Sequence, residues 1–312
     1  MIYVTQGHEK SIGLEVFLKS FLLLKKSEQN NFTLICNKNT LKKYLNLLKI
    51  KNSFDKSFVK IENGNLNCYF TNKTEYSESL ESLLTGIKLT QEGHRQNLLV
   101  TLPTTKDQLK YKKNNFLGHT EFFRHYFKNN FLPMLFFNER LSMLLLTDHC
   151  SLNSVSRKIK KKFIVEKIKI ILDTPLSNDN NYNEVLFSGI NPHAGENGLL
   201  GKEDCEIKFA IKILNKLYPK INFKGPFAAD SMFGLLSNSK KQLLVYAYHD
   251  QGLCLFKGYS SYMGINITLG LPFLRLSVDH GTAFHLYGKN SANYNGCFYV
   301  LKKSLEFSRG LL

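Results

Sequence analysis

Histidines follow apolar, strand-like runs at four places in this sequence. The run LLVYAY leads to His249, and LPFLRLSV leads to Asp279 and His280. Upstream, LSMLLLTD leads to His149 and EVLFSGINP leads to His193. In an open α/β sheet, ligands bind outside the carboxyl ends of the strands, so side chains just past such runs can converge although they are distant in sequence. The pattern predicts a ligand site at the edge of a sheet.

Imidazole side chains at such an edge suit two kinds of chemistry. Neutral imidazole is the commonest side-chain ligand for zinc-like metals, and it also exchanges protons near neutral pH. The alternative is that each histidine only makes hydrogen bonds within its own loop. Because the sequence has no local metal-binding spacing such as HExxH, both interpretations stay open at this point.

Three further side chains, between His249 and His280, are suited to binding an anion. Lys257, Asn266 and Arg275 lie in a stretch that is otherwise rich in glycine and apolar residues. Cationic and amide donors of this kind form charge-assisted hydrogen bonds with carboxylate or phosphate oxygens. We therefore expect a small anionic ligand.

The strong positive charge of the chain does not by itself indicate a nucleic-acid partner. The formal net charge is +17 over 312 residues, but only six of the 42 basic residues are arginine. Lysine and asparagine are abundant throughout, and the densest basic cluster, residues 157–162, stops at the apolar Phe163. This distribution is typical of solvated helix faces, so we expect no nucleic-acid binding.

The cysteine pattern and the hydropathy indicate a reduced, cytoplasmic protein. Six cysteines are dispersed without a CxxC pair, which argues against a disulfide framework and a structural zinc knuckle. The opening residues 1–7 have the pattern of a strand and turn rather than of a signal peptide. No apolar run approaches the roughly 18 residues of a membrane span, so we expect no membrane association.

Strand-like and helix-like segments alternate along the chain, which predicts an α/β fold with a mostly parallel sheet. Residues 151–172 form one basic amphipathic pattern and predict a single helix. The phenylalanines of residues 122–137 indicate core packing rather than a base-stacking platform, and residues 178–183 (NDNNYN) indicate a polar loop. The glycines of GENGLLG have the spacing GxxGxxG, which is not the dinucleotide-binding GxGxxG pattern.

Four motifs closely resemble those of the 4-hydroxythreonine-4-phosphate dehydrogenase family of vitamin B6 biosynthesis. They are GHTEFF, GINPHAGENGLLGKED, YHDQG and GINITLGLPFLRLSVDHGTA. The resemblance is strongest over residues 118–123 and 188–283, and it is traceable from residue 2 to about residue 300. Several long motifs in matching order make a chance similarity implausible.

The resemblance implies a variant of the isocitrate/isopropylmalate dehydrogenase fold. This fold has two α/β/α domains with the active site in the cleft between them, and residues of both subunits of a homodimer contribute. Here the first domain would comprise residues 1–118 and about 278–312, and the second would comprise residues 119–277. The apolar segment 122–137 offers surface for an isologous dimer interface.

Carried over residue by residue, the resemblance implies four groups of site residues. The metal ligands fall on His149, His193 and His249. The substrate contacts fall on His119, Thr120, Lys257, Asn266 and Arg275. The cofactor side falls on His280, Gly281 and Thr282. Asp230 and Asp250 are acid–base candidates, and the alternative is that each only orients a histidine.

The implied reaction is the oxidation of 4-phosphohydroxy-L-threonine by NAD or NADP to a β-keto acid that loses carbon dioxide. One divalent ion per subunit, Zn, Mg or Co, would stabilise the developing negative charge. Three neutral imidazoles leave coordination positions open for the substrate hydroxyl, while Lys257 and Arg275 can neutralise a phosphate.

Three segments depart from the family pattern. The opening GDPAGIGPE is GHEKSIGLE here, with His8 in place of the aspartate, and TAPVHK is TLPTTK. The nucleotide-side loop carries Phe284, His285 and Tyr287 where leucine, glutamate and alanine are usual. The departures leave two alternatives open: a related dehydrogenase of erythronate or threonate phosphates or of another hydroxy acid, and a non-catalytic phosphate- or nucleic-acid-binding paralogue.

Overall fold

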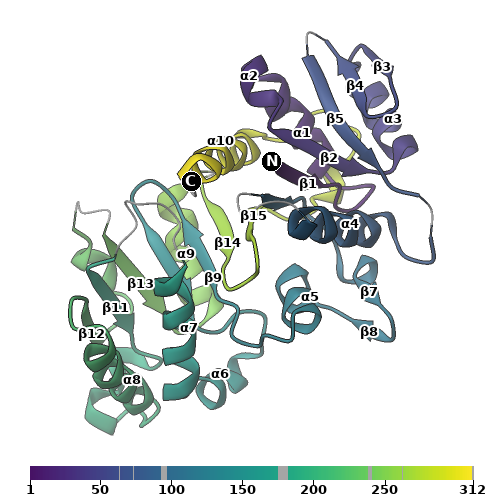
Figure 1. The fold of residues 1–312 in the computed structure, drawn as a ribbon. Helices are drawn as coiled ribbons and strands as arrows, with labels where there is room; N and C mark the ends of the chain where they lie inside the picture. Colours follow the sequence, from purple (N-terminus) through teal and green to yellow (C-terminus); the bar gives the residue numbers. More distant parts are fainter. Residues whose placement is uncertain are drawn as a thin grey trace. The chain divides into compact units, whose positions relative to one another are not determined.

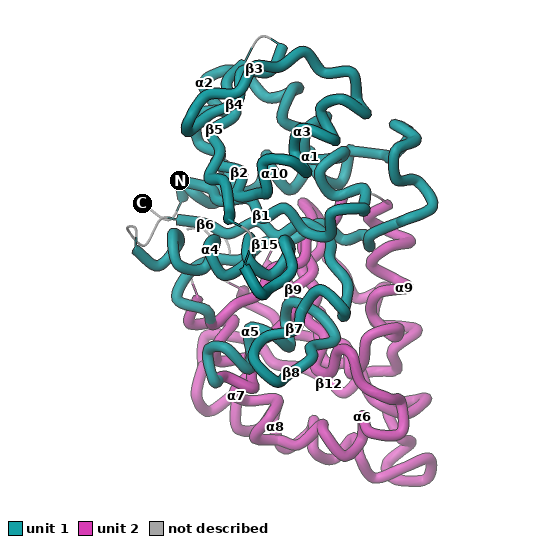
Figure 2. Tube along the Cα trace, turned by 90° about the vertical axis from the view of Figure 1, so that its right-hand side faces the viewer, with its two compact units in different colours: residues 1–128, 271–312 teal, residues 129–270 magenta. Residues whose placement is uncertain are grey.

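The structure is a computed structural model that describes residues 1–62, 64–72, 74–92, 97–174, 182–237, 241–261 and 263–310. The chain forms two compact units (Figure 2). Unit 1 comprises residues 1–128 and 271–312, and unit 2 comprises residues 129–270. His119, Thr120 and Arg275, which the sequence-based boundaries at 118 and 278 assign to the second domain, therefore belong to unit 1.

Unit 1 is built from alternating strands and helices. In chain order they are β1 (Ile2–Thr5), α1 (Gly13–Leu22), α2 (Lys26–Gln29), β2 (Phe32–Cys36), α3 (Lys38–Leu47), β3 (Asn52–Phe54), β4 (Phe58–Ile61), β5 (Gly64–Phe70), α4 (Glu78–Glu92), β6 (Leu98–Thr101), η1 (Lys106–Gln108), β7 (Lys110–Tyr111), β8 (Asn114–Asn115), α5 (His119–Tyr126), β15 (Leu274–Val278), η4 (Phe284–Leu286) and α10 (Asn295–Gly310).

The main sheet of unit 1 has the strand order β15-β6-β1-β2-β5-β4-β3 (Figure 1). Pairing is parallel from β15 to β5, and β4 and β3 are antiparallel to their neighbours. Adjacent side chains of a strand point to opposite faces, and Val4 and Thr5 of β1 are both buried, so both faces of this sheet are covered. Helix α4 packs on β1, β2 and β6, whereas α10 packs on α1, β15, β1 and β6.

Unit 2 repeats this alternation. Its elements are β9 (Met134–Phe137), β10 (Ser142–Leu145), α6 (Leu152–Lys158), α7 (Lys161–Asp173), β11 (Glu184–Ser188), η2 (Pro192–Gly198), α8 (Asp204–Leu217), β12 (Asn222–Phe227), η3 (Met232–Leu235), β13 (Gln242–Tyr246), α9 (His249–Ser260) and β14 (Ile265–Thr268). Its strands have the order β12-β11-β13-β10-β9-β14, parallel from β12 to β10. Strand β9 runs antiparallel to both β10 and β14.

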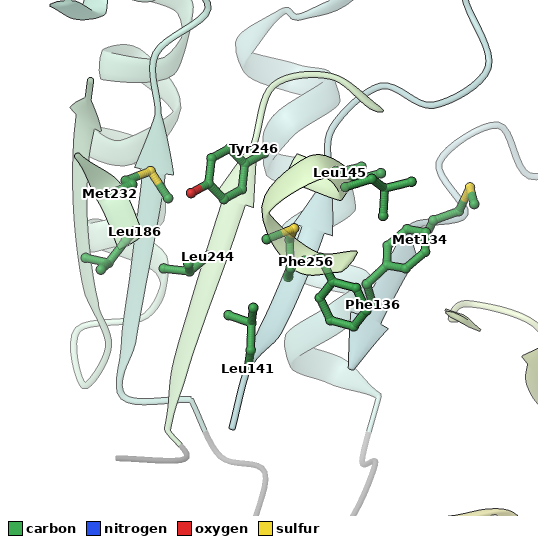
Figure 3. Packing of buried hydrophobic residues seen from close by; sticks show 11 residues of the cluster. Met134, Phe136, Leu141, Leu145, Leu186, Met232, Leu244, Tyr246 and Phe256 are labelled. Atoms are coloured by element: carbon green, nitrogen blue, oxygen red, sulfur yellow. The ribbon is translucent and has the colours of Figure 1, made fainter. Parts of the chain in front are cut away.

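The core of unit 2 forms where α9 packs against the sheet (Figure 3). Phe256 of α9 is fully buried, and its ring centre lies 5.6 Å from that of Phe136 on β9. Leu244 and Tyr246 of β13 belong to the same cluster. Full burial of a large apolar side chain contributes about 1.5–3 kcal/mol, so this contact fixes α9, and with it the turn that precedes α9, on the sheet.

The alternating α/β prediction is confirmed, but the single helix predicted over residues 151–172 is wrong. The structure has two helices there, α6 and α7, separated at Ile159 and Lys160. Ile159 leaves the helical conformation, with ψ at 94°, and its side chain is completely buried. Burial of this side chain therefore outweighs the continuation of the helix through residues 159 and 160. Most of the predicted polar loop at 178–183 lies outside the described residues.

Three phenylalanines of the segment 122–137 are core, as the sequence predicts. Phe122, Phe123 and Phe136 are at most 2% exposed. These three side chains are buried within the chain, whereas Phe127, Phe131 and Phe137 of the same segment are half-buried, so the dimer surface expected here stays a prediction.

Two helical glycines offer a test of this packing. A Cβ on Gly86 of α4 would lie 2.8 Å from Leu99 Cδ1 and 2.9 Å from Thr5 Cγ2, whereas a Cβ on Gly258 of α9 would meet nothing within 4 Å. Replacing a helical glycine by alanine stabilises by roughly 0.5–1 kcal/mol, and overpacking costs typically about 1–3 kcal/mol. Gly258→Ala should therefore raise the free energy of unfolding in urea, and Gly86→Ala should lower it. Equal effects of the two substitutions would contradict the described helix–sheet contact.

Candidate active site

Three of the four predicted histidine turns follow adjacent parallel strands of unit 2. His193 follows β11, His249 follows β13 and His149 follows β10, and these strands are neighbours in the order β11-β13-β10. The carboxyl ends of parallel strands meet at one edge of a sheet, so the three turns share the edge at which α/β proteins bind ligands. The fourth, His280, follows β15 in unit 1.

Hydrogen bonds connect these three turns to one another. Thr147, two residues before His149, donates from its backbone N (3.0 Å) and its Oγ1 (2.9 Å) to the carbonyl of Ala247. The amide of Ala247 donates to Gln251 Oε1 (2.8 Å), and Gln251 Nε2 donates to the carbonyl of Gly189 (2.9 Å). Ser188 Oγ adds a bond to Gln251 Oε1 (3.0 Å). The backbone around each histidine is thereby fixed relative to its neighbours.

Two of the predicted metal ligands lie side by side. The ring centres of His149 and His249 are 5.5 Å apart. Imidazoles that share one ion through bonds of about 2.0–2.1 Å have ring centres roughly 5 Å apart, so this pair fits a divalent metal. His249 Nδ1 lies 2.8 Å from Asp250 Oδ1, so Nε2 is the ring atom that could ligate an ion, and the imidazole has a carboxylate partner of the kind common in metal sites. Among the described residues of one chain, however, no three His, Cys, Asp or Glu side chains are grouped to hold a metal, so His193 does not complete the set.

His193 lies in a left-handed turn. Residues 193–197 all have positive φ, from 42° to 77°, and only one of them, Gly195, is a glycine. The left-handed conformation costs other residues roughly 1–2 kcal/mol each. Surrounding contacts must stabilise such a turn, and strained backbone of this kind concentrates at functional sites.

The other predicted polar residues of unit 2 differ in their surroundings. Lys257 is exposed on α9, and Asp230 is exposed before η3. Asn266 on β14 is half-buried, and its Oδ1 is a buried acceptor with no hydrogen-bond partner among the described residues. An unsatisfied buried acceptor costs about 1–3 kcal/mol, which a ligand hydroxyl or ammonium group would offset.

Arg275 is a buried cation in unit 1. It is 3% exposed, and its Nε and Nη2 donate to Thr101 Oγ1 at 3.1 and 2.6 Å. Its Cζ lies 5.7 Å from the centre of the Phe123 ring, within cation–π range. Burial lowers the pKa of the guanidinium to about 9, so it remains charged at neutral pH.

His119 lies next to this cation, at the first position of α5. Its ring stacks on Phe123 with centres 6.5 Å apart. Desolvation, and secondly the positive charge of Arg275, lower the pKa of His119 well below its usual 6.5, although the side chain keeps some exposed surface. His119 is therefore a neutral imidazole at neutral pH, and the adjacent Thr120 is buried.

The predicted cofactor residues and the segments that depart from the family pattern meet in unit 1. The amide of Ile12 donates to the carbonyl of Thr282 (3.0 Å), and the His8 and Phe284 rings contact edge to face at 4.9 Å. The amide of His8 donates to the carbonyl of Pro103 (2.9 Å). His280 Nδ1 lies 3.0 Å from the carbonyl of Gly281. The loops containing residues 7–15, 101–106 and 279–288 thus form one contiguous region.

Comparison with known proteins identifies the class. The family model described as pyridoxal phosphate biosynthetic protein PdxA matches residues 27–302. A 4-hydroxythreonine-4-phosphate dehydrogenase of Campylobacter fetus is 32% identical over 98% of this chain and 97% of its own. A protein of Oceanobacillus iheyensis, provisionally named D-threonate 4-phosphate dehydrogenase, is 30% identical over 99% of this chain and 98% of its own.

A solved structure supports the same class. The crystal structure of a 4-hydroxythreonine-4-phosphate dehydrogenase from Burkholderia phymatum matches with a TM-score of 0.76 at 26% identity, over 98% of this chain and 97% of the other. The fold and the sequence therefore define a dehydrogenase of the PdxA type. This chain belongs to the PdxA family.

Sequence reasoning missed two residues that hold the site together. Gln251 was only part of the YHDQG motif, and Thr101 was only the first residue of the TLPTTK segment. Their roles depend on contacts between segments far apart in sequence, for which one sequence gives no signal.

The bond between Thr101 and Arg275 predicts a selective effect on stability. Thr101→Val keeps the shape but removes the acceptor of two guanidinium donors, and hydrogen bonds to charged groups contribute about 1.5–3 kcal/mol. We expect a loss of that order in the free energy of unfolding, measured in urea. Thr101→Ser should recover most of it, and a serine variant as unstable as the valine variant would contradict the bond.

The depressed pKa of His119 predicts a pH effect with a definite sign. The unfolded chain binds a proton at this histidine below pH 6.5, whereas the folded chain does not until the pH is well below that value. Stability should therefore fall as the pH drops below about 6.5. Between about pH 7.5 and 5.5, wild type should lose more unfolding free energy than His119→Gln. Equal losses of unfolding free energy in wild type and His119→Gln would show that the pKa of His119 is not lowered in the folded protein.

Proposed function

We propose that this chain catalyses the metal-dependent oxidation of 4-phosphohydroxy-L-threonine by NAD or NADP. The product is a β-keto acid that decarboxylates to 3-amino-2-oxopropyl phosphate, in the biosynthesis of pyridoxal 5'-phosphate. The observation that carries the proposal is the pair of imidazoles, His149 and His249, at the carboxyl edge of the sheet in a chain of the PdxA family. Relatives named for this substrate match nearly the whole chain.

The proposed reaction has two steps, an oxidation and a decarboxylation. In the first, the C3 hydroxyl loses its proton to a base and the C3 hydrogen leaves as hydride to the nicotinamide ring, which gives the ketone and NAD(P)H. In the second, the carboxylate leaves as carbon dioxide, and the electron pair of the broken bond is protonated at carbon. A bound divalent ion, Zn, Mg or Co, supplies Lewis acidity that stabilises negative charge on the reacting oxygen.

The protein's own residues have distinct roles in this proposal. Asp250 orients His249 through the bond to Nδ1, so we assign it a positioning role and leave Asp230 as the base candidate. Neutral His119 can accept a hydrogen bond from the substrate, and His280, Gly281 and Thr282 form the cofactor side. These assignments follow the family motifs and the contacts described above.

The metal site is proposed to be shared between two copies of the chain. Among the described residues of one chain, no three His, Cys, Asp or Glu side chains are grouped as metal ligands, although His149 and His249 lie side by side. A second copy can supply the remaining imidazole, which makes the active form a homodimer with one ion per subunit. Light scattering in the presence of Zn²⁺ should give the mass of a dimer, and a fully active monomer would contradict a shared site.

A second substrate class is favoured by a specific observation. The Oceanobacillus iheyensis relative, which matches the whole length of this chain, is named for D-threonate 4-phosphate. The departures from the family pattern cluster around His8 and Phe284 in unit 1, whereas the turns of His149, His193 and His249 belong to unit 2. Divergent segments around His8 and Phe284 combined with intact metal and phosphate motifs would suit a related phosphorylated hydroxy acid.

One experiment separates these substrates. NADH and NADPH formation should be followed with 4-phosphohydroxy-L-threonine, D-threonate 4-phosphate and D-erythronate 4-phosphate, each with and without EDTA. The proposal expects the highest kcat/KM for the first substrate and loss of activity in EDTA. A higher kcat/KM for D-threonate 4-phosphate would assign the chain to the second class, and turnover that EDTA does not change would remove the metal from the reaction.

Arg275 provides a test of phosphate recognition. If it binds the phosphate, Arg275→Ala should lower kcat/KM by about 10- to 150-fold, since a charge-assisted hydrogen bond contributes roughly 1.5–3 kcal/mol. Arg275→Lys should recover only part, because an ammonium cannot reproduce the planar fork of donors.

The deciding measurement for Arg275 is a ratio. It compares kcat/KM for the phosphorylated substrate with kcat/KM for its unphosphorylated analogue, in wild type and in Arg275→Ala. A lower ratio in the variant means that Arg275 recognises the phosphate. An unchanged ratio together with lower thermal stability would mean that Arg275 has a structural role and does not recognise the phosphate.

A further inference from the structure

The left-handed turn that carries His193 lies directly on a buried carboxylate. Asp204, the first residue of α8, is 3% exposed. Its Oδ1 accepts a hydrogen bond from the amide of Ile190 (2.6 Å), and its Oδ2 accepts from Asn191 Nδ2 (2.9 Å) and, at 3.4 Å, from the Asn191 amide. Asn191 Nδ2 also donates to Glu203 Oε2 (3.0 Å), so Asp204 is the acceptor that the donors of Ile190 and Asn191 share.

The packing around this carboxylate leaves no room for a side chain at Gly189 or Gly195. A Cβ on Gly189 would lie 2.9 Å from Asp204 Oδ1, and a Cβ on Gly195 would lie 2.9 Å from Asp204 Oδ2. The carboxylate thus contacts the chain both before and within the left-handed segment. A turn whose conformation is locally unfavourable needs such contacts to remain in place.

A second side chain connects the same turn to the His249 turn. Gln251 accepts from the amide of Ala247 and donates to the carbonyl of Gly189. Asp204 therefore holds the His193 turn against α8, while Gln251 holds the start of that turn against the segment that leads to His249. Neither side chain is among the residues that the family motifs assign to metal, substrate or cofactor.

We propose that Asp204 is a positioning residue of the active site: it fixes the strained His193 turn and thereby the place of the His193 imidazole. The metal-binding part of this inference rests on the proposed function, and the part concerning the turn does not. Partners that orient a metal ligand change metal affinity by about 10- to 100-fold when they are removed.

The test compares two isosteric substitutions in the first turn of α8. Asp204→Asn replaces one acceptor oxygen by an NH₂ group that faces the donors of Asn191. Glu206→Gln removes the same charge from the same helix turn, but its Oε2 accepts from the amide of Lys161 on α7 and not from the His193 turn. Loss of the helix-dipole interaction is therefore common to both variants.

The first readout is amide hydrogen exchange at Ile190 and Asn191. Asp204→Asn should exchange faster there than wild type, whereas Glu206→Gln should match wild type. If Asp204→Asn does not fold, Asn191→Ala can be used instead, because it removes the side-chain donor to Asp204 Oδ2. It should also speed amide exchange at these residues, but by less. Unchanged exchange in the folded variant overturns the proposal.

The second readout is Zn²⁺ affinity, measured by calorimetry on the purified full-length protein. Asp204→Asn should bind Zn²⁺ about 10- to 100-fold more weakly than wild type, and Glu206→Gln should bind it equally well. Faster exchange with unchanged affinity would overturn the positioning role. If wild type binds no Zn²⁺ at all, the proposed metal function fails instead, and the exchange comparison alone decides whether Asp204 fixes the turn.

Discussion

The hydrogen bonds between the turns at the carboxyl edge of β11, β13 and β10 are the constraint on which the candidate site depends. Parallel strands bring the turns to one edge, but they do not fix the conformation of each turn. Ala247 and Gln251 do this, because one backbone unit and one amide side chain join the turn after β10 to the turn after β11. Burial of Phe256 and Leu253 holds α9 on the sheet, which keeps Gln251 within reach of both.

The candidate site residues of unit 1 include a buried cation, Arg275. The Arg275 guanidinium packs on Phe123 and donates to Thr101, and its charge lowers the pKa of His119 further than burial alone. The result is a positive group and a neutral imidazole side by side. Such a pair is suited to an anionic substrate that also needs a hydrogen-bond acceptor. The described part of unit 2 carries two adjacent imidazoles and a buried amide oxygen without a hydrogen-bond partner.

Much of the fold could be predicted from the sequence because its signals are local. Apolar runs followed by histidines gave the correct strands, and glycine-rich motifs gave the family. The helix break at Ile159 could not be predicted, since burial of one side chain overrode a continuous helical pattern. The burial of Arg275 also could not be predicted from the sequence, because it depends on Thr101 and Phe123, which are far away in the chain. The same applies to Asp204, whose partners precede it by more than ten residues.

The proposed reaction oxidises and then decarboxylates a phosphorylated hydroxy amino acid. The most direct measurement is the stoichiometry of carbon dioxide to reduced nicotinamide during complete conversion of 4-phosphohydroxy-L-threonine that carries a ¹³C label in its carboxylate. The account predicts one labelled carbon dioxide for each NAD(P)H formed. Formation of NAD(P)H without labelled carbon dioxide, or no NAD(P)H at all with any of the phosphorylated hydroxy acids, would contradict it.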